Sequence, residues 1–539
     1  MPKKTILFLV IILAIASFFR LWQLDKIPPG LYPDVAINGN EALESLRTGN
    51  LKLFYPENNG REGLIMWLIA LSFSIFGVSI WSIKIVAAAI GILTVLGLFL
   101  LTKELFKNTE TGSLLIALLS SFFLATSFWH TNFSRIGFRA ILLPFILVFS
   151  FYFLFRGFRT KKILNFIISG VFFGLGFYTY ISFRFAILIL PAILIPYWFI
   201  YKKEGQPRKF LFSVLCFLFA VFFVALPIGI YFVQNPQDFI GRATPVSIFA
   251  TKNPIKEFFK SLILHLAMFN FYGDPNWRHN FSGSPMLPWP LGILFLIGLF
   301  ISIREIFRES NYQSKNYQFL STFYFLLSTF FIMLLPGILT FEGIPHSLRV
   351  IGAIPVVYIF VAIGALEIYK FFEKNTKSPE GKPSASYGAR KKLLLIASLL
   401  FLTAMAFSEF DKYFFDWGRN KEVKGAFTER FAREGEFLNS LPKEVQKYVI
   451  VNESGVSVPW PDGIPMSAQT IMFIENMKYG SPKSNYLLPK DLDRIKINKE
   501  KTVIVSMTFD QNIMNELLKR FPEGEVEERE GFGIFKVNF

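Results

Sequence analysis

Long apolar segments separated by short basic connectors fill the chain up to about residue 410 and limit what it can fold into. Many approach the length of about 20 residues that an α-helix needs to cross the hydrocarbon core of a bilayer. Only 18% of the residues are charged, against about 25% in soluble chains. The sequence therefore predicts a polytopic α-helical membrane protein and excludes the disordered, collagen-like and coiled-coil classes.

The net charge of +17 belongs to the apolar part of the chain, because 19 basic and 20 acidic residues nearly cancel from residue 410 onward. The basic excess gathers in connectors at residues 3–4, 103–107, 156–162, 202–209, 304–315 and 370–392. Basic connectors between apolar spans are typical of cytoplasmic loops. The charge thus indicates membrane topology, and no nucleic acid partner is expected.

Reading the apolar segments against these connectors predicts eleven transmembrane helices. They are residues 5–24, 79–102, 112–128, 140–156, 163–180, 184–201, 210–232, 289–304, 319–339, 349–369 and 393–409. An odd number places the N-terminus in the cytoplasm and everything after residue 410 outside the cell (plasma) membrane. A signal peptide is an alternative for the first span, but Arg20 and Trp22 anchor its end and no small-x-small cleavage site follows.

Residues 63–77 are apolar but only about 15 residues long, short for a span. If they crossed the membrane, every later basic connector would change sides. We therefore expect an outer-face interfacial helix here, with Met66 and Trp67 on its apolar side.

Two domains are predicted. Residues 1–410 form a transmembrane module with large outer loops at 25–78 and 233–288, and residues 411–539 form a small extracytoplasmic domain. In the latter, helix-like segments at 421–440, 467–478 and 510–520 alternate with strand-like segments at 448–451, 502–505 and 533–535. This alternation is typical of an α/β domain.

Several chemistries are excluded by missing motifs. The single cysteine, Cys216, lies within an apolar run, so neither a disulfide framework nor a CxxC zinc site can form. The chain also lacks the glycine-rich phosphate loops, the HExxH zinc motif, the GxSxG nucleophile motif and the EF-hand pattern.

The first outer loop offers a carboxylate after a rigid turn. Asp34 follows the run Pro-Pro-Gly-Leu-Tyr-Pro and precedes a helix-like segment, residues 35–46, that carries Glu41. Asp34 could cap that helix. Alternatively, it could deprotonate or orient an acceptor hydroxyl, or bind a metal.

The same loop continues to Arg61 and Glu62 through Asn-Asn-Gly. Glycine there allows the backbone to approach a ligand closely. The two charged residues could simply pair at the headgroup level, but a guanidinium at the outer leaflet also suits a lipid phosphate or pyrophosphate.

Other expected outer turns carry further candidates for substrate binding, namely His130, Arg135, Arg139, Arg184, His346 and Arg349. Basic residues should concentrate on the inner side, so arginines outside need a reason. Snorkelling to the interface is one. Convergence on the anionic group of a lipid-linked substrate is the other.

The densest polar run, residues 272–283, contains Asp274, Trp277, Arg278 and His279. Sugars present hydroxyl edges and apolar faces, so a loop with hydrogen-bonding groups and a stacking tryptophan suits a sugar-binding surface. A structured loop whose polar groups satisfy one another remains the alternative.

Together these motifs resemble those of the C-type membrane glycosyltransferase superfamily, in particular the protein O-mannosyltransferases, the aminoarabinose transferase of lipid A, and bacterial dolichyl-phosphate-mannose-protein mannosyltransferase-like relatives. The resemblance covers residues 1 to 410. It rests on residues 29–34, 58–62, 129–130, 134–139 and 273–280.

The resemblance implies an inverting transfer of a sugar from a polyprenyl-phosphate donor at the outer membrane face, with Asp34 as the base and Arg61 as a phosphate ligand. Many relatives have Asp-Glu at the first-loop site, whereas Val35 follows Asp34 here, and Glu41 is a partial substitute. No cofactor is certain, and a divalent cation is a candidate. The expected partners are the donor lipid, membrane lipids and an acceptor that is a protein, lipid or glycan.

Two other functions compete with this one. A polyprenyl-lipid flippase or other transporter would also need many spans and an anionic-lipid site. Transporters, however, place key polar residues at the bilayer midplane, whereas apart from sparse groups such as Lys84 the candidates here lie near the outer ends of spans. A non-catalytic membrane anchor would leave the outer arginines without a role.

Overall fold

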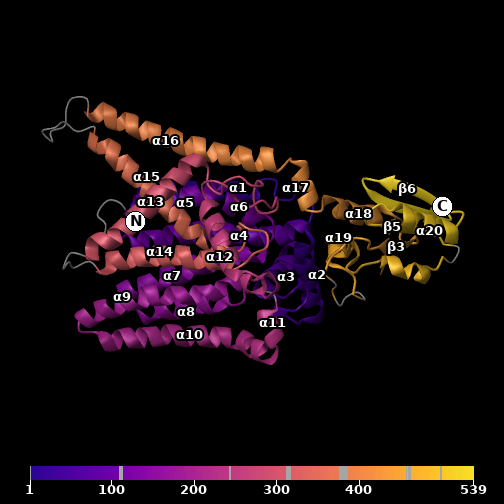
Figure 1. Cartoon of the computed structure of the whole chain (residues 1–539), viewed down its shortest axis with the longest axis horizontal. Helices are drawn as coiled ribbons and strands as arrows, with labels where there is room; N and C mark the ends of the chain where they lie inside the picture. Colours follow the sequence, from indigo (N-terminus) through magenta and orange to yellow (C-terminus); the bar gives the residue numbers. More distant parts are fainter. Residues whose placement is uncertain are drawn as a thin grey trace. The chain divides into compact units, whose positions relative to one another are not determined.

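A computed structural model describes residues 2–107, 113–241, 244–310, 317–375, 387–456, 458, 463–497 and 500–539 (Figure 1). The chain forms two compact units. Unit 1 comprises Met1–Trp22, Ala87–Arg135 and Arg139–Trp417, and unit 2 comprises Gln23–Val86, Ile136–Phe138 and Gly418–Phe539. Each is described separately.

Unit 1 is helical. Its α-helices are α1 (Lys3–Leu21), the greater part of α4 (Ile80–Leu105), α5 (Ser113–Thr126), α6 (Phe128–Arg135), α7 (Leu142–Thr160), α8 (Ile163–Gly176), α9 (Leu190–Lys203), α10 (Pro207–Gln234), α11 (Pro236–Ile240), α12 (Pro254–Ala267), α13 (Trp289–Ser310), α14 (Tyr317–Ile338), α15 (Ile354–Asn375) and α16 (Tyr387–Asp411). Short 3₁₀ segments are η1 (Arg139–Ile141), η2 (Ile181–Ile189), η3 (Thr244–Val246), η4 (Ile248–Ala250) and η5 (Ile351–Ala353), and the π-helical η6 (Lys412–Trp417) continues α16.

The helices confirm a multi-pass membrane protein. Within the described residues, nine helices are long and apolar enough to cross a membrane, or ten spans when the bent pair α5 and α6 counts as one. The predicted number of eleven differs because the segment at 163–180 folds as α8, which has 14 residues. At 1.5 Å per residue such a helix spans about 21 Å, short of a hydrocarbon core of about 30 Å.

Close helix packing inside unit 1 uses glycine. A Cβ at Gly298 of α13 would lie 1.9 Å from the carbonyl oxygen of Phe360 on α15. A Cβ at Gly364 of α15 would lie 2.0 Å from the carbonyl oxygen of Leu294 on α13. The two backbones therefore approach each other as only small residues permit, a packing mode common between membrane helices.

The break between α5 and α6 bends the chain by 57°. Arg20 of α1 donates hydrogen bonds to the carbonyls of Ala125 (2.8 Å) and Leu124 (3.2 Å) just before the break. Arg135 at the end of α6 donates in return to the carbonyl of Phe19 (3.0 Å) at the end of α1. Both arginines are fully buried. The two guanidinium groups thus satisfy carbonyls that helix ends leave without partners.

Unit 2 begins with α2 (Pro33–Thr48), the hairpin strands β1 (Phe54–Tyr55) and β2 (Arg61–Glu62), and α3 (Leu64–Phe76). Its C-terminal part contains α17 (Lys421–Ala426), α18 (Glu429–Ser440), β3 (Gln446–Ile450), η7 (Met466–Ala468), α19 (Gln469–Tyr479), β4 (Asn485–Leu487), η8 (Pro489–Arg494), β5 (Thr502–Ser506), α20 (Gln511–Arg520), β6 (Glu525–Arg529) and β7 (Phe532–Val537). The predicted helix at 63–77 is therefore confirmed as α3, while its place at the membrane interface stays a prediction.

The C-terminal strands form a five-stranded sheet in the order β4-β3-β5-β7-β6. β3 runs parallel to β4 and β5, and β7 runs antiparallel to β5 and β6. Alternate residues of β3 face opposite sides: Val449 packs in one core with residues of α18 and α19, and Ile450 packs in the other with residues of α20. The predicted small α/β domain is confirmed.

The first loop packs against this C-terminal part within unit 2. Asn40 of α2 donates to the side chain of Gln469 (2.8 Å) and accepts from Asn476 (2.8 Å), both on α19. The carbonyl of Leu31 accepts the hydroxyl of Thr470 at 2.8 Å. Gly30, at φ +70°, has no room for a side chain, since a Cβ would lie 2.6 Å from the carbonyl oxygen of Phe427. Two segments far apart in sequence thus share one interface, while the domain boundary at residue 410 stays a prediction.

Glu434 on α18 gives a test of unit 2. It is completely buried, and neither carboxylate oxygen has a hydrogen-bond partner. Burial raises its pKa well above the usual range, although Arg430 at 3.5 Å opposes the shift. The folded chain therefore holds a proton that the unfolded chain releases near pH 4.5, so stability is present below that pH and is lost as pH rises towards the folded pKa.

Glu434→Gln, which resembles the protonated acid, should raise the free energy of unfolding at pH 8 by about 1–3 kcal/mol and have little effect near pH 4. Thermal unfolding of the purified chain across this range measures the difference. Glu436→Gln, at an exposed position of the same helix, is the matched control and should show no such trend. Equal curves for wild type and Glu434→Gln would contradict a protonated Glu434.

Candidate active site

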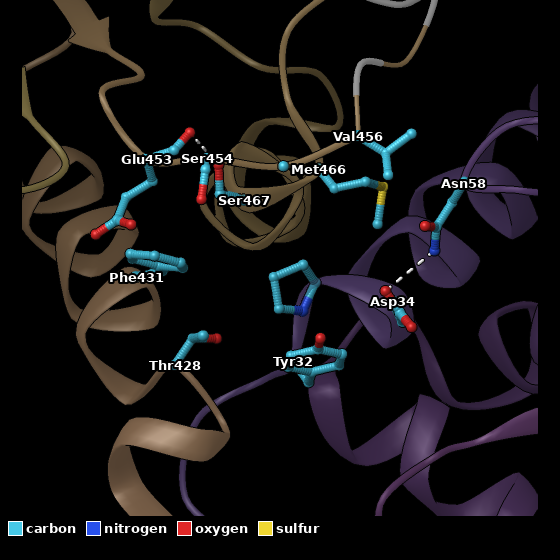
Figure 2. Close-up of a pocket in the computed structure, with 12 residues that line it drawn as sticks. Tyr32, Asp34, Asn58, Thr428, Phe431, Glu453, Ser454, Val456, Met466 and Ser467 are labelled. Atoms are coloured by element: carbon cyan, nitrogen blue, oxygen red, sulfur yellow. Dashed lines mark hydrogen bonds between the residues drawn. The ribbon is translucent and has the colours of Figure 1, made fainter. Parts of the chain in front are cut away.

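Asp34 lies in the first turn of α2, one residue after Pro33, which begins the helix. The N-cap position belongs to Tyr32, and no side chain caps the helix end. Capping, the structural alternative for Asp34, is therefore not its role here. Its Oδ1 accepts a hydrogen bond of 3.0 Å from the side-chain amide of Asn58 (Figure 2). A carboxylate near a helix N-terminus is also stabilised by the helix dipole.

Asn58 reaches Asp34 from the turn between β1 and β2. Asn58, Asn59 and Gly60 all have positive φ, at 52°, 61° and 86°. Asparagine and glycine are the residues that most readily adopt this left-handed conformation. The Asn-Asn-Gly sequence therefore permits the tight turn that brings the amide to the carboxylate.

Asp34 borders a pocket of about 360 Å³ within unit 2. Figure 2 shows Asp34 and Asn58 on one side of it and Thr428, Phe431 and Glu453 on the other. The full lining is Tyr32, Pro33, Asp34, Asn58, Thr428, Phe431, Glu453, Ser454, Gly455, Val456, Met466 and Ser467. The first loop and the C-terminal part thus both contribute walls, mixing hydroxyl, carboxylate and aromatic groups.

Arg61 and Glu41 form an ion pair next to the pocket, with Arg61 fully buried and the Glu41 side chain 16% exposed. The guanidinium donates to Glu41 (2.6 Å), to Asn38 (2.9 Å) and to the carbonyl of Glu57 (3.2 Å), and its side chain is fully buried. Burial raises the pKa of Glu41 to about 7, although Arg61 opposes the shift. Glu62 of β2 is also buried. Arg61 therefore balances charge within the protein in this structure.

In unit 1, Asp274 gathers several donors. Its Oδ2 accepts from His279 Nδ1 (3.1 Å) and from the backbone N–H (2.7 Å) and hydroxyl (2.9 Å) of Ser347, and its Oδ1 accepts the N–H of Asn276 (2.8 Å). Burial would raise the pKa of this carboxyl, but the neighbouring histidines and these hydrogen bonds outweigh it and lower the pKa. One donor atom each from Asp274, His279 and His346 lies within 4.8 Å of the others.

Two neighbours of Asp274 in the predicted sugar-binding run, Trp277 and Arg278, make contacts within unit 1, and their sugar-binding role stays a prediction. The ring of Trp277 packs against that of Phe281, with centroids 5.0 Å apart. The backbone carbonyl of Trp277 accepts the indole N–H of Trp417 at 2.9 Å. The carbonyl of Arg278 accepts the side-chain amide of Asn132 at 2.7 Å.

Three arginines that were predicted to bind substrate lie in or contact the segment 180–184. Arg139 lies 5.4 Å from the ring of Tyr180. The carbonyl of Arg349 accepts the hydroxyl of Ser182 at 3.0 Å. Arg184 lies within this segment and contacts aromatic rings. The three arginines thus lie beside one segment, and their convergence on an anionic group of a substrate stays a prediction.

Arg135 and His130 lie elsewhere in unit 1. Both are fully buried. The Nδ1 atom of His130 is 2.7 Å from the guanidinium of Arg20, so it accepts that hydrogen bond. His130 contacts Arg20, and Arg135 donates to the carbonyl of Phe19. The substrate-binding role of both residues stays a prediction.

A family described as dolichyl-phosphate-mannose-protein mannosyltransferase matches residues 64–231. Among solved structures, ArnT from Cupriavidus metallidurans bound to undecaprenyl phosphate has a TM-score of 0.58 at 11% identity, covering 98% of this chain and 97% of that one. The Archaeoglobus fulgidus oligosaccharyltransferase in the apo form has a TM-score of 0.54 at 13% identity, covering 88% of this chain and 64% of that one. The family match covers less than a third of the chain, and the two solved structures show that the chain shares the fold of ArnT and of this oligosaccharyltransferase.

No curated protein matches this chain significantly in sequence. A third solved relative, oligosaccharyltransferase AglB from Archaeoglobus fulgidus in complex with an inhibitory peptide and a dolichol-phosphate, has a TM-score of 0.50 at 14% identity and covers 100% of this chain and 74% of that one. At such identities the likeness to solved structures shows the fold.

The sequence did not predict the residues that face Asp34 from the C-terminal part, among them Thr428, Glu453 and Ser454. No sequence motif marks them, because they reach the pocket only through packing of segments about 400 residues apart. Ser347 was also missed as a partner of Asp274. Its place directly after His346 was the available signal.

The Arg61–Glu41 pair gives a second test. Arg61→Met would leave a buried carboxyl without its cation and should destabilise the chain by about 3 kcal/mol. Because the remaining Glu41 would then favour its protonated form, the loss should be larger at pH 8 than at pH 5. Adding Glu41→Gln should recover part of it. Thermal unfolding measures each effect.

Arg47→Met, at an exposed arginine of the same helix α2, is the control and should unfold like wild type. An Arg61→Met variant that matched this control at both pH values would show that the pair contributes no stability.

Proposed function

We propose that this protein is a glycosyltransferase that moves a sugar from a polyprenyl-phosphate-linked donor to an acceptor on the outer face of the membrane, with inversion at the anomeric carbon. The observation that carries the proposal is the carboxylate of Asp34, which does not cap its helix and lies at the wall of a pocket of mixed polar and apolar lining, in a fold shared with ArnT. The undecaprenyl phosphate and dolichol-phosphate bound by the solved relatives support a polyprenyl carrier.

The proposed reaction is a direct displacement. An acceptor hydroxyl or amine attacks the anomeric carbon while the bond from that carbon to the phosphate oxygen breaks. The proton of the acceptor passes to Asp34, and the phosphate leaves on its polyprenyl carrier. Asn58 holds Oδ1 of the carboxylate, so Oδ2 takes the proton. A positioned base contributes about 10²–10⁴-fold to such a step.

The acceptor enters this proposal as a protein, a lipid or a glycan. The hydroxyl and aromatic groups of Thr428, Ser454 and Phe431 around the pocket suit any acceptor that presents a hydroxyl beside an apolar surface. We also propose that the N-terminus is cytoplasmic and that residues 411–539 lie outside, as the distribution of basic connectors predicts.

The test is transfer of a radiolabelled hexose from polyprenyl phosphate by the purified full chain, with cell envelope as acceptor. Asp34→Asn should lower kcat by about 10²-fold or more while lipid binding persists. Asn58→Ala should cause a smaller loss, because it frees the carboxylate without removing it. Asp25→Asn, at an exposed position in the same loop, is the matched control.

Unchanged transfer by Asp34→Asn would contradict its role as the base. If neither wild type nor variant transfers sugar, movement of a fluorescent polyprenyl lipid in vesicles tests the flippase alternative. Lipid movement without transfer would replace the proposed function.

A further inference from the structure

We propose that Asp274, His279 and His346 form a zinc site in unit 1. The inference stands on the geometry of these side chains and does not rest on the proposed glycosyltransferase function. The three residues come from two segments, one before α13 and one after α14, so that folding alone brings them together. Asp274 and His279 are buried, and the His346 side chain is 15% exposed.

The donor atoms are close to the spacing that zinc needs. Bonds of 2.0–2.1 Å in a tetrahedral site put neighbouring donors about 3.4 Å apart. Asp274 Oδ2 and His279 Nδ1 are 3.1 Å apart, and Asp274 Oδ2 and His346 Nδ1 are 3.9 Å apart. All three donor atoms lie within 4.8 Å of one another, so they must draw together by at most about 1.4 Å to reach this spacing.

An unpaired atom supports a ligand at this place. His346 Nδ1 is buried and has no hydrogen-bond partner, and its 3.9 Å to Asp274 is too long for a hydrogen bond. Leaving a buried polar atom unpaired costs free energy. A metal ion bound to this nitrogen would remove that cost.

The surrounding residues hold the three ligands as the outer partners of metal sites do. Ser347 and Asn276 donate backbone N–H groups to the two oxygens of Asp274. His265 is 2.8 Å from the carbonyl of Ser261 through Nδ1, so its Nε2 accepts the backbone N–H of His346 at 3.2 Å. The hydrogen bonds to Asp274 Oδ1 and to His265 Nε2 involve no proposed ligand atom, so they can hold the loops while zinc is bound, whereas Ser347 would share Oδ2 with the metal.

The donor set selects the class of metal. Two imidazoles and one carboxylate match catalytic zinc sites, which keep a fourth position open. Magnesium and calcium prefer six or more oxygen ligands, and within the described residues this group offers only one carboxylate. Zinc binds the lone pair of a neutral imidazole, so on binding the proton that lies between His279 Nδ1 and Asp274 Oδ2 moves through solvent to His279 Nε2. The open position would take a water molecule or an anionic oxygen.

The test uses the purified full chain with any affinity tag removed. After treatment with a chelator, the protein is incubated with Zn²⁺, passed through a desalting column and analysed for metal. Wild type should retain about one zinc per chain. His346→Gln should lower the zinc affinity at least tenfold, as expected when a ligand or its close partner is lost. Glu342→Gln, which changes a carboxylate four residues earlier, is the matched control and should retain zinc.

A second measurement guards against variants that fail to fold. Co²⁺ added to the wild-type chain should give the intense visible absorption of a four-coordinate site, and Zn²⁺ should abolish it. Wild type without retained zinc, a weak six-coordinate cobalt spectrum, or zinc binding unchanged in a folded His346→Gln variant would each overturn the proposal.

Discussion

Carbonyl groups at buried helix ends cannot bind bulk water, and each of them needs a partner inside the protein. In unit 1 this constraint is met by two buried guanidinium groups. Arg20 satisfies the end of α5, and Arg135 satisfies the end of α1. Because each arginine belongs to the element that the other one caps, α1 and the α5–α6 pair hold each other in place.

Unit 2 uses buried cations in a similar way. Lys84 is buried and donates to the carbonyl of Pro28 at 2.9 Å. Arg61 ties α2 to the β1–β2 hairpin through Glu41 and Asn38. The buried side chains of Lys84 and Arg61 therefore fix the first loop. The carboxylate of Asp34 is more accessible and lies at the pocket. This division separates groups that hold the loop from the group proposed to act on substrate.

The sequence predicted those features that depend on local pattern. Segment length and apolar content indicated the membrane spans, and alternating strands and helices indicated the α/β domain. It missed β6, whose residues Glu525–Arg529 are mostly exposed and charged and so carry no apolar alternation. For Arg135, the sequence could not distinguish a residue that caps a helix from one that binds a phosphate. The partners that distinguish those roles, such as Phe19, lie more than 100 residues away.

Gly30 and Leu31 have a consequence for how such a chain can be recombined. Only glycine fits at position 30 against the backbone of Phe427, and Leu31 and Asn40 form hydrogen bonds with residues of α19. A hybrid that exchanged the C-terminal part for that of a relative would bring a foreign surface against an unchanged first loop. The first loop and the C-terminal part therefore act as one module, although most of the helices lie between them in the sequence. A functional hybrid must take both pieces from the same parent.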